Sequence, residues 1–239
     1  MKNLRIITVL LVIFAFTSCT SGQFRKTVYG NHNVVTKERT VGSFSAVKAS
    51  SGVDVYIKQG DAGPISVEAD ENLHEYIITE VRNGELNVYT EANIRKAERM
   101  RVYVTIPEVI SLRSTSAGNI IGQSPIKSDR LELSSSSAGD IRVELHANDV
   151  KVKISSSGDM NLSGDADKLD ADLSSAGDLK AYNLEVREAY VSASSAGDAE
   201  VNVTEKITAR ASSAGDIYYM GNPKYVDFHS SSAGGIHKR

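Results

Sequence analysis

The 239-residue sequence has no tryptophan, one cysteine and four prolines. A single cysteine excludes an internal disulfide framework and a cysteine-ligated zinc site. The formal net charge is only −3, and Lys and Arg are not concentrated in a stripe, so we predict that nucleic acid is not a partner. Beyond the N-terminus, no apolar run is long enough to cross a membrane. The length is ample for a sizeable core in one or two domains.

The N-terminus has the features of an export signal. Two basic residues precede an apolar run over residues 6–16, which is too short for a retained transmembrane helix. Cys19 follows in a setting that resembles the lipobox of bacterial lipoproteins, whose cysteine is lipidated and becomes the first residue. Phe16 departs from this pattern, because leucine is usual there. The alternative is ordinary cleavage after Gly22, which would discard Cys19.

These features predict the domain organisation and the location. We expect a lipoprotein-type signal peptide over 1–18, a polar tether over 19–37 and one β domain over 38–236. The lipid on Cys19 would be the sole membrane attachment. The predicted location is the cell envelope, as an outer-membrane lipoprotein that faces either the periplasm or the cell surface.

The second half of the chain is a repeat. A core of the type Ser-Ala-Gly-Asp-Ile recurs seven times, and its glycines are spaced by 18 to 21 residues: Gly118, Gly139, Gly158, Gly177, Gly197, Gly215 and Gly234. Around each core, small or apolar residues alternate with polar ones, which is strand geometry. No helical pattern separates the copies, so a parallel α/β sheet is excluded. Identical turns at a constant phase predict an all-β chain that forms a β-solenoid with rungs of about 19 residues.

Stacking of the rungs would turn each repeat position into a column. We expect a buried serine column whose hydroxyls pair with one another, and beside it a glycine column at a sharp bend or a close approach of backbones. The predicted serine column consists of Ser116, Ser137, Ser156, Ser175, Ser195, Ser213 and Ser232.

The position after each glycine predicts an outward acidic column. It runs from Asn119 through Asp140, Asp159, Asp178, Asp198 and Asp216 to Gly235. Carboxylates about 5 Å apart repel each other by roughly 0.8 kcal/mol in water. Either backbone N–H groups of each turn offset this repulsion, or a file of Ca²⁺ ions does. One carboxylate per rung favours the turn interpretation, so no metal site is assigned and Ca²⁺ stays the only candidate cofactor.

The first half is strand-rich but less regular. Residues 49–57 are a degenerate eighth copy of the repeat, and Asn83-Gly84 is a strong hairpin signal. A short helix is expected over 71–78, and residues 101–107 form a strand that leads into the first full rung. We therefore predict that 38–111 is an irregular part that caps the regular solenoid of 112–236.

Several of these motifs together resemble the GIN head-domain family of auto-transporter adhesins, which is common in Bacteroidetes. They are Thr105-Ile106-Pro107, the recurring Ser-Ala-Gly-Asp/Asn-Ile cores, Val41-Gly42-Ser43-Phe44 and Gly52-Val53-Asp54-Val55. The resemblance covers about residues 38–236 and implies a right-handed parallel β-helix. It brings no catalytic residues. Unlike an autotransporter, this chain has no membrane barrel of its own and would depend on the lipid.

Catalytic motifs are not evident. The five histidines share no metal-binding spacing, and no nucleophile elbow surrounds any serine. Tyr218 and Tyr219, with Tyr225 and Phe228, form either a cap for the last rungs or a sugar-stacking patch. The leading hypothesis is a non-enzymatic envelope protein that binds a protein or glycan surface through a solenoid face. The alternatives are a polysaccharide-active enzyme, which rests on fold analogy alone, and a purely structural or stress-related periplasmic protein.

Overall fold

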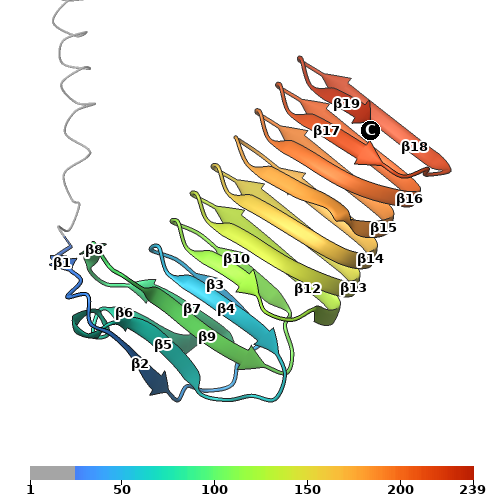
Figure 1. Ribbon diagram of the computed structural model, residues 1–239. Coiled ribbons are helices and arrows are strands. Elements are labelled where there is room, and N and C mark those ends of the chain that lie inside the picture. Colours follow the sequence, from blue (N-terminus) through green and yellow to red (C-terminus); the bar gives the residue numbers. More distant parts are fainter. Residues whose placement is uncertain (1–24) are drawn as a thin grey trace, which may run out of the picture.

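The computed structural model describes residues 25–239, which form 19 β-strands and one 3-10 helix. The expected signal peptide and Cys19 lie outside these residues. Figure 1 shows an elongated β-solenoid of about seven turns, with an irregular cap at its N-terminal end and an exposed last rung at its C-terminal end. Within residues 25–239, no helix has the length and apolar character that a membrane crossing requires. The predicted solenoid with rungs of about 19 residues is confirmed.

The N-terminal part contains nine strands and the 3-10 helix η1. They are β1 (Thr27–Tyr29), β2 (Val34–Arg39), β3 (Ala46–Ala49), β4 (Asp54–Gln59), β5 (Ile65–Asp70), η1 (Glu71–Leu73), β6 (Ile77–Arg82), β7 (Glu85–Thr90), β8 (Asn93–Arg95) and β9 (Met100–Ile106).

The remaining strands wind as parallel rungs. They are β10 (Ser111–Ser114), β11 (Asn119–Gly122), β12 (Ile126–Ser136), β13 (Asp140–Ser155), β14 (Asp159–Leu173), β15 (Asp178–Ser194), β16 (Asp198–Ser212), β17 (Asp216–Met220), β18 (Tyr225–Ser231) and β19 (Gly235–Lys238). Neighbouring rungs pair in parallel, for example Asp140 with Asp159 and Val152 with Ala171.

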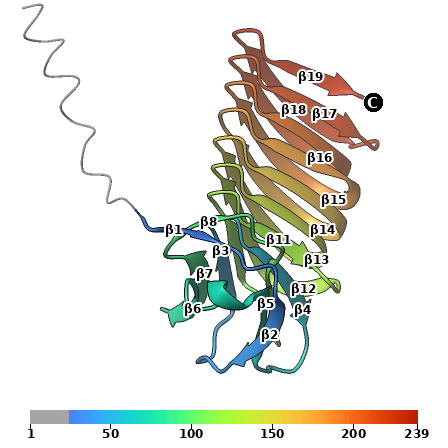
Figure 2. The same cartoon turned by 60° about the vertical axis from the view of Figure 1, so that its left-hand side comes forward.

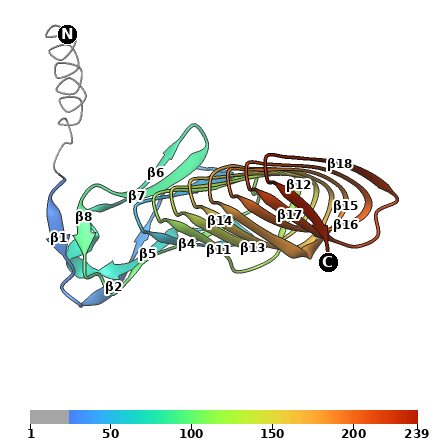
Figure 3. The ribbon, with the colours of Figure 1, turned by 90° about the horizontal axis from the view of Figure 1, so that it is seen from above.

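Each rung has two sides, joined by a tight turn at one edge and a bend at the other (Figure 2). Face A is the outer surface of β4, β9, β11, β17, β19 and the first halves of β13 to β16. Face B is the outer surface of β3, β7, β10, β12, β18 and the second halves of β13 to β16. The bends lie where pairing is interrupted, for example at Asn148 and Asp167. Seen from above, the rungs superimpose as flattened coils (Figure 3).

The tight turns consist of two residues in the left-handed conformation. Ser116 and Ala117 have φ values of 51° and 59°, and the N–H of Gly118 donates to the C=O of Thr115 at 3.0 Å. This is the type I′ geometry that closes a β-hairpin, although here it joins the two sides of a coil. The N–H of Ala117 also donates to the C=O of Ser137 at 3.1 Å, so hydrogen bonds continue between rungs even at the turns.

These turns show that the prediction of a buried serine column was wrong. The six predicted serines from Ser116 to Ser213, together with Ser232, are exposed at the turn tips, because two consecutive left-handed residues interrupt the in–out alternation of the strand. The buried serines are Ser114 and Ser135, two residues earlier in their rungs. Their hydroxyls donate to the C=O groups of Gly118 and Gly139, which confirms only that buried hydroxyls find partners.

The glycine column confirms a close approach of backbones. A Cβ atom on Gly139 would lie 2.7 Å from the carbonyl carbon of Ser114 and 2.7 Å from the amide nitrogen of Thr115, both in the preceding rung. Gly118, Gly215 and Gly234 face backbone atoms in the same way. These glycines do not have positive φ, so space and not conformational freedom explains the residue type.

The core is a set of aliphatic columns between the two faces. Ile141, Met160, Leu179, Ala199 and Ile217 occupy one register position under face A and are at most 1% exposed. Columns of Val, Leu, Ile and Ala under face B are equally buried. The solenoid is therefore filled with packed side chains, and its alternating pattern follows from this packing.

The cap covers the N-terminal end of this core. β2 and β9 pair with β5 in antiparallel orientation, and β6 and β7 form the hairpin predicted from Asn83-Gly84. The expected helix over 71–78 is shorter, because η1 ends at Leu73 and β6 begins at Ile77. The expected tether of 19–37 needs a correction: β1 pairs with β8 and β2 with β5, so the chain is folded from residue 27 onward.

The glycine column gives a direct test of rung packing. We expect Gly139→Ala to lower the free energy of unfolding by about 2 kcal/mol, because the new methyl group meets fixed backbone atoms. The measurement is the urea midpoint followed by far-UV circular dichroism. Gly63→Ala is the matched control: it has open space around it and no positive φ, so its effect should stay within about 0.5 kcal/mol. Equal effects of the two variants would contradict the packing argument.

Candidate binding groove on face A

The predicted acidic column is present on face A. The register pairs Asn119 with Asp140, Asp140 with Asp159, Asp159 with Asp178, and Asp198 with Asp216, and it ends at Gly235. The structure extends the column at its other end, where Asp54 pairs with Asn119. The expected offset by N–H groups of the same turn is replaced by contacts between rungs. The N–H of Asp178 donates to Asp159 Oδ1 at 3.3 Å, and the N–H of Asp216 donates to Asp198 Oδ1 at 3.2 Å.

The electrostatic cost of this column is visible in two of its members. Partial burial, and then the nearby charge of Asp159, raise the pKa of Asp140. Burial, and then the charges of Asp159 and Asp198, raise the pKa of Asp178. Asn119 relieves the repulsion locally, since its Nδ2 donates to Asp54 Oδ1 at 2.7 Å. Among residues 25–239 there is no group of three or more His, Cys, Asp or Glu residues that could hold a metal ion, so the Ca²⁺ file stays an untested prediction.

A second outward column on face A contains aromatic residues. Tyr103 pairs with Tyr56, which pairs with Ile121, and Ile121 pairs with Arg142. The rings of Tyr56 and Tyr103 stack with centroids 5.1 Å apart and an interplanar angle of 21°. The hydroxyl of Tyr103 donates to Glu68 Oε2 at 2.9 Å, which fixes the lower ring. In the next rung the residue in register with Tyr56 is the aliphatic Ile121, and Arg101 lies over the Tyr56 ring with its Cζ 5.7 Å from the centroid.

Above Tyr56 lies a groove of about 340 Å³. Ile121 lies on its floor, the column from Asp54 through Asn119 to Asp140 forms one side, and Arg142 and Lys180 lie toward its far end. At about 4.8 Å per rung, Tyr56 and Arg142 are about 10 Å apart along the solenoid axis. The groove therefore combines one aromatic surface with hydrogen-bond donors and acceptors of both charges.

Face B has a different charge pattern. Its outward residues alternate in sign along the solenoid axis: Arg130 pairs with Asp149, Asp149 with Lys168, Lys168 with Glu188, and Glu188 with Lys206. In the next column, Lys151 pairs with Asp170. Opposite charges on neighbouring strands stabilise a sheet by roughly 0.2–1 kcal/mol per pair. A hollow of about 510 Å³ on this face lies beside Tyr190, whose side chain is 42% exposed.

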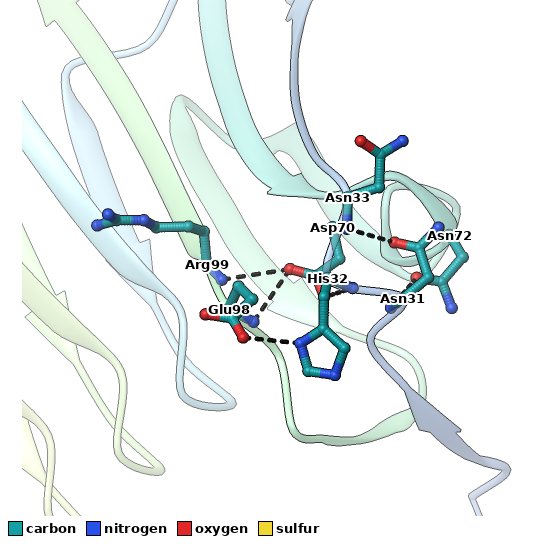
Figure 4. A network of polar contacts seen from close by, with 7 residues as sticks. All are labelled: Asn31, His32, Asn33, Asp70, Asn72, Glu98 and Arg99. Atoms are coloured by element: carbon teal, nitrogen blue, oxygen red, sulfur yellow. Dashed lines mark hydrogen bonds and ion pairs between the residues drawn. The ribbon is translucent and has the colours of Figure 1, made fainter.

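A buried carboxylate connects the chain entry to the cap (Figure 4). Asp70 is fully buried, its Oδ2 accepts the N–H of His32, and its Oδ1 accepts the N–H groups of Glu98 and Arg99 at 3.0 and 3.3 Å. His32 has a φ of 60°, and its ring contacts Glu98 Oε1 at 2.7 Å. All of the groups that Asp70 contacts are backbone donors of the cap, so this cluster holds three loops together and is not an open site.

The remaining histidines are dispersed. His74 is buried and its Nε2 contacts the C=O of Val35 at 3.1 Å; burial lowers its pKa. His146 contacts Asp165 at the bend edge, while His229 and His237 lie in the last rung. The sequence analysis found the acidic column but missed the Tyr56–Tyr103 pair. Tyr56 and Tyr103 each occupy an outward position in the alternating pattern of their strands. Only the register of β4 with β9 brings the two rings together.

The acidic column predicts that neutralising one member stabilises the fold. A raised pKa in the folded state means that the stabilising contribution is full below the ordinary carboxyl pKa and is lost as pH rises. We therefore expect Asp178→Asn to increase the free energy of unfolding at pH 7 by about 0.5 kcal/mol and to leave it unchanged near pH 3. Asn keeps the acceptor oxygen and can donate along the column as Asn119 does.

The control for this prediction is Asp172→Asn on face B, where the carboxylate lies opposite Lys153. This variant should be neutral or destabilising at pH 7. Urea unfolding of both variants at the two pH values is the measurement. A destabilised Asp178→Asn at pH 7 would show that the carboxylates do not repel one another.

Comparisons with known proteins agree with this geometry. A crystal structure described as a putative adhesin from Bacteroides fragilis matches with a TM-score of 0.82 and 21% identity, over 89% of this chain and 100% of that one. A putative adhesin from Parabacteroides merdae matches with a TM-score of 0.71 and 23% identity, over 90% and 99%. A "putative lipid binding protein" from Parabacteroides distasonis has a TM-score of 0.71 and 22% identity, over 90% and 100%.

Curated proteins gave no match to the sequence. The family model described as "putative auto-transporter adhesin, head GIN domain" matches residues 43–223, which is most of the solenoid and part of the cap. The chain belongs to this head GIN domain family.

Proposed function

We propose that this chain is a non-enzymatic binding protein of the cell envelope, of the adhesin type, and that the groove on face A holds a neutral glycan. The observation that carries the proposal is that Tyr56 lines this groove beside the polar column of Asp54, Asn119 and Asp140. The family description and the adhesins among the structural neighbours support a binding role.

A pyranose ring suits this groove for three reasons. It has an apolar face that can pack on Tyr56, as aromatic side chains with one polar end commonly do at binding surfaces. Its hydroxyl groups both donate and accept, which matches the carboxylates of Asp54 and Asp140 and the amide of Asn119. The charges that line the groove are of both signs, Arg142 and Lys180 against Asp54, Asp140 and Asp159, so a strongly charged ligand has little advantage.

Face B is a weaker candidate for the same ligand. Its charges already have partners of opposite sign in the neighbouring rungs, so a ligand would have to replace contacts that the sheet already makes. Tyr190 lies between Asp170 and Thr208 and has no aromatic partner in either neighbouring rung. Face A offers an aromatic wall that is already stacked, and the repeated rungs beyond it allow weak contacts to add along a polymer.

The second candidate function is glycan hydrolysis. Asp140 and Asp159 lie in neighbouring rungs at the groove, and the pKa of Asp140 is raised. Two carboxylates about 5 Å apart can serve as acid and nucleophile in a retaining glycosidase. Reducing-end release from the bound oligosaccharide, and its loss in Asp140→Asn, would favour this function over simple binding.

The glycan proposal predicts different effects for two tyrosines on opposite faces. Tyr56→Ala should weaken binding to neutral hexose oligosaccharides by about tenfold, because it removes a stacking surface worth about 1.4 kcal/mol. The measurement is calorimetry with the tightest binder from an immobilised panel of glucose, galactose and mannose hexamers. Tyr190→Ala on face B is the matched control and should bind as the wild type does. Equal losses in both variants, or no binder in the panel, would contradict the proposal.

Attachment to the envelope is a separate proposal with its own test. Cys19→Ala should release the protein from the membrane fraction into the soluble fraction, because the lipid would be its attachment. Protease treatment of intact cells then distinguishes the two orientations. Digestion of the wild type in whole cells indicates a surface-facing solenoid and an adhesive role. Digestion only after the outer membrane is opened indicates a periplasmic binding protein and contradicts surface adhesion. Membrane retention of Cys19→Ala would contradict lipid attachment.

A further inference from the structure

The last rung of the solenoid, made of β18 and β19, leaves interior positions uncovered. Val226 and Phe228 pair with Ile207 and Ala209 of β16, which are fully buried. In β18, the same column positions are 56% and 37% exposed, and neighbouring Tyr225 is 69% exposed. Figure 1 shows β18 and β19 as the outermost strands at this end. The inward side of this rung is therefore apolar surface in contact with solvent.

The backbone of this rung is also available for pairing. β18 pairs only with β16, and β19 only with β17, among the strands of residues 25–239. The outer edge of a parallel strand presents free N–H and C=O groups, and such an edge is a template for another strand. All seven residues of β18 are exposed, so nothing in the described chain blocks this edge.

The opposite end of the solenoid does not offer a matching surface. There the cap places β2, β5 and η1 across the core, and Ile65, Val67 and Leu73 are at most 1% exposed. Head-to-tail stacking of two copies would require an uncovered first rung. The surface that matches an open last rung is another open last rung, and two such surfaces meet through a two-fold axis.

We propose that two copies of this chain associate end to end through β18, in antiparallel orientation, with Phe228 on the two-fold axis. In an antiparallel pair, residues directly opposite each other point to the same side of the sheet, whereas consecutive residues of one strand point to opposite sides. A symmetric pair therefore places one residue opposite its own copy, and the two-fold axis passes midway between these two copies. With Phe228 at the axis, Asp227 lies opposite His229 of the partner subunit, and all seven residues of β18 are paired. An axis at Asp227 would place two carboxylates opposite each other, and one at His229 would leave Tyr225 and Val226 unpaired.

This register gives complementary side-chain contacts on both sides of the joined sheet. On the outer side, Asp227 accepts a hydrogen bond from a ring N–H of the partner's His229, and the symmetric contact repeats it. On the inner side, the two Phe228 rings meet, and Val226 of each copy lies beside Ser230 of the partner subunit. Lys238 occupies an inward position of β19, in register with Tyr219, and its Nζ donates to Asn222 Oδ1 at 2.9 Å.

Cysteine cross-linking tests the register. In the full chain carrying Cys19→Ala, which has no other thiol, Phe228→Cys places two thiols opposite each other with Cα atoms about 5 Å apart, within the range of a disulfide. Val226→Cys is the control: it is more exposed, but its symmetric mate lies four residues away, about 13 Å along the strand. We expect a disulfide-linked dimer under mild oxidation for Phe228→Cys and not for Val226→Cys. Equal cross-linking of the two would overturn the register.

Sedimentation equilibrium tests the association itself and does not depend on glycan binding. Cys19→Ala should sediment as a concentration-dependent dimer. Val226→Lys should weaken the dimer at least tenfold, whereas Val34→Lys, at a solvent-exposed valine of β2 in the cap, should not. His229→Asp should weaken it too, and Asp227→His together with His229→Asp should restore it. A monomer at every concentration up to the solubility limit, or a dimer indifferent to Val226→Lys, would overturn the proposal.

Discussion

The structure depends on rungs that stack in parallel and in register, apart from local register shifts where β15 pairs with β14 and with β16. Two contacts maintain this register at the tight-turn edge. The glycine after each turn allows the backbones of successive rungs to approach, and the N–H of a turn residue such as Ala117 bonds to the C=O of the next turn. Once one edge is aligned, each position along the strand must form a column. The core columns, the acidic column and the Tyr56–Tyr103 pair all follow from this alignment.

Alignment has opposite electrostatic results on the two faces. On face A it places like charges together, because the repeat puts an aspartate after each glycine. On face B it places unlike charges together, since Asp149 follows Arg130 and Lys168 follows Asp149. Face B is therefore satisfied by its own neighbours. Face A keeps a column of like charges, in which burial and neighbouring carboxylates raise the pKa of Asp140 and that of Asp178.

The repeat made much of this architecture predictable. A constant spacing of glycines and a period of two were enough to predict the solenoid and the acidic column. The exposure of the turn serines was not predictable from alternation, because left-handed residues at the turns interrupt the alternation only there. The folding of residues 27–37 was also missed. It depends on Asp70, which is remote in sequence and holds His32 through a backbone hydrogen bond.

The candidate site was less predictable than the fold for a related reason. Tyr56 lies in the degenerate eighth copy and Tyr103 in an irregular strand, so no repeat rule relates them. Their stacking requires β9 to lie beside β4, a pairing that skips the whole β5–β8 region of the chain. The sequence analysis assigned Tyr225 and Phe228 either to a cap of the last rungs or to a sugar-stacking patch, whereas the structure leaves both side chains exposed within the last rung itself.

The chain enters at the cap and leaves at the last rung, so its first described residue and its exposed rung lie at opposite ends of the long axis (Figures 1 and 2). A rod held by its cap end presents its tip outward. In two copies joined through their last rungs, the two cap ends lie at opposite ends of the proposed dimer. Both cap ends therefore cannot be attached to one flat surface, and attachment of both copies through their N-termini would require two facing surfaces.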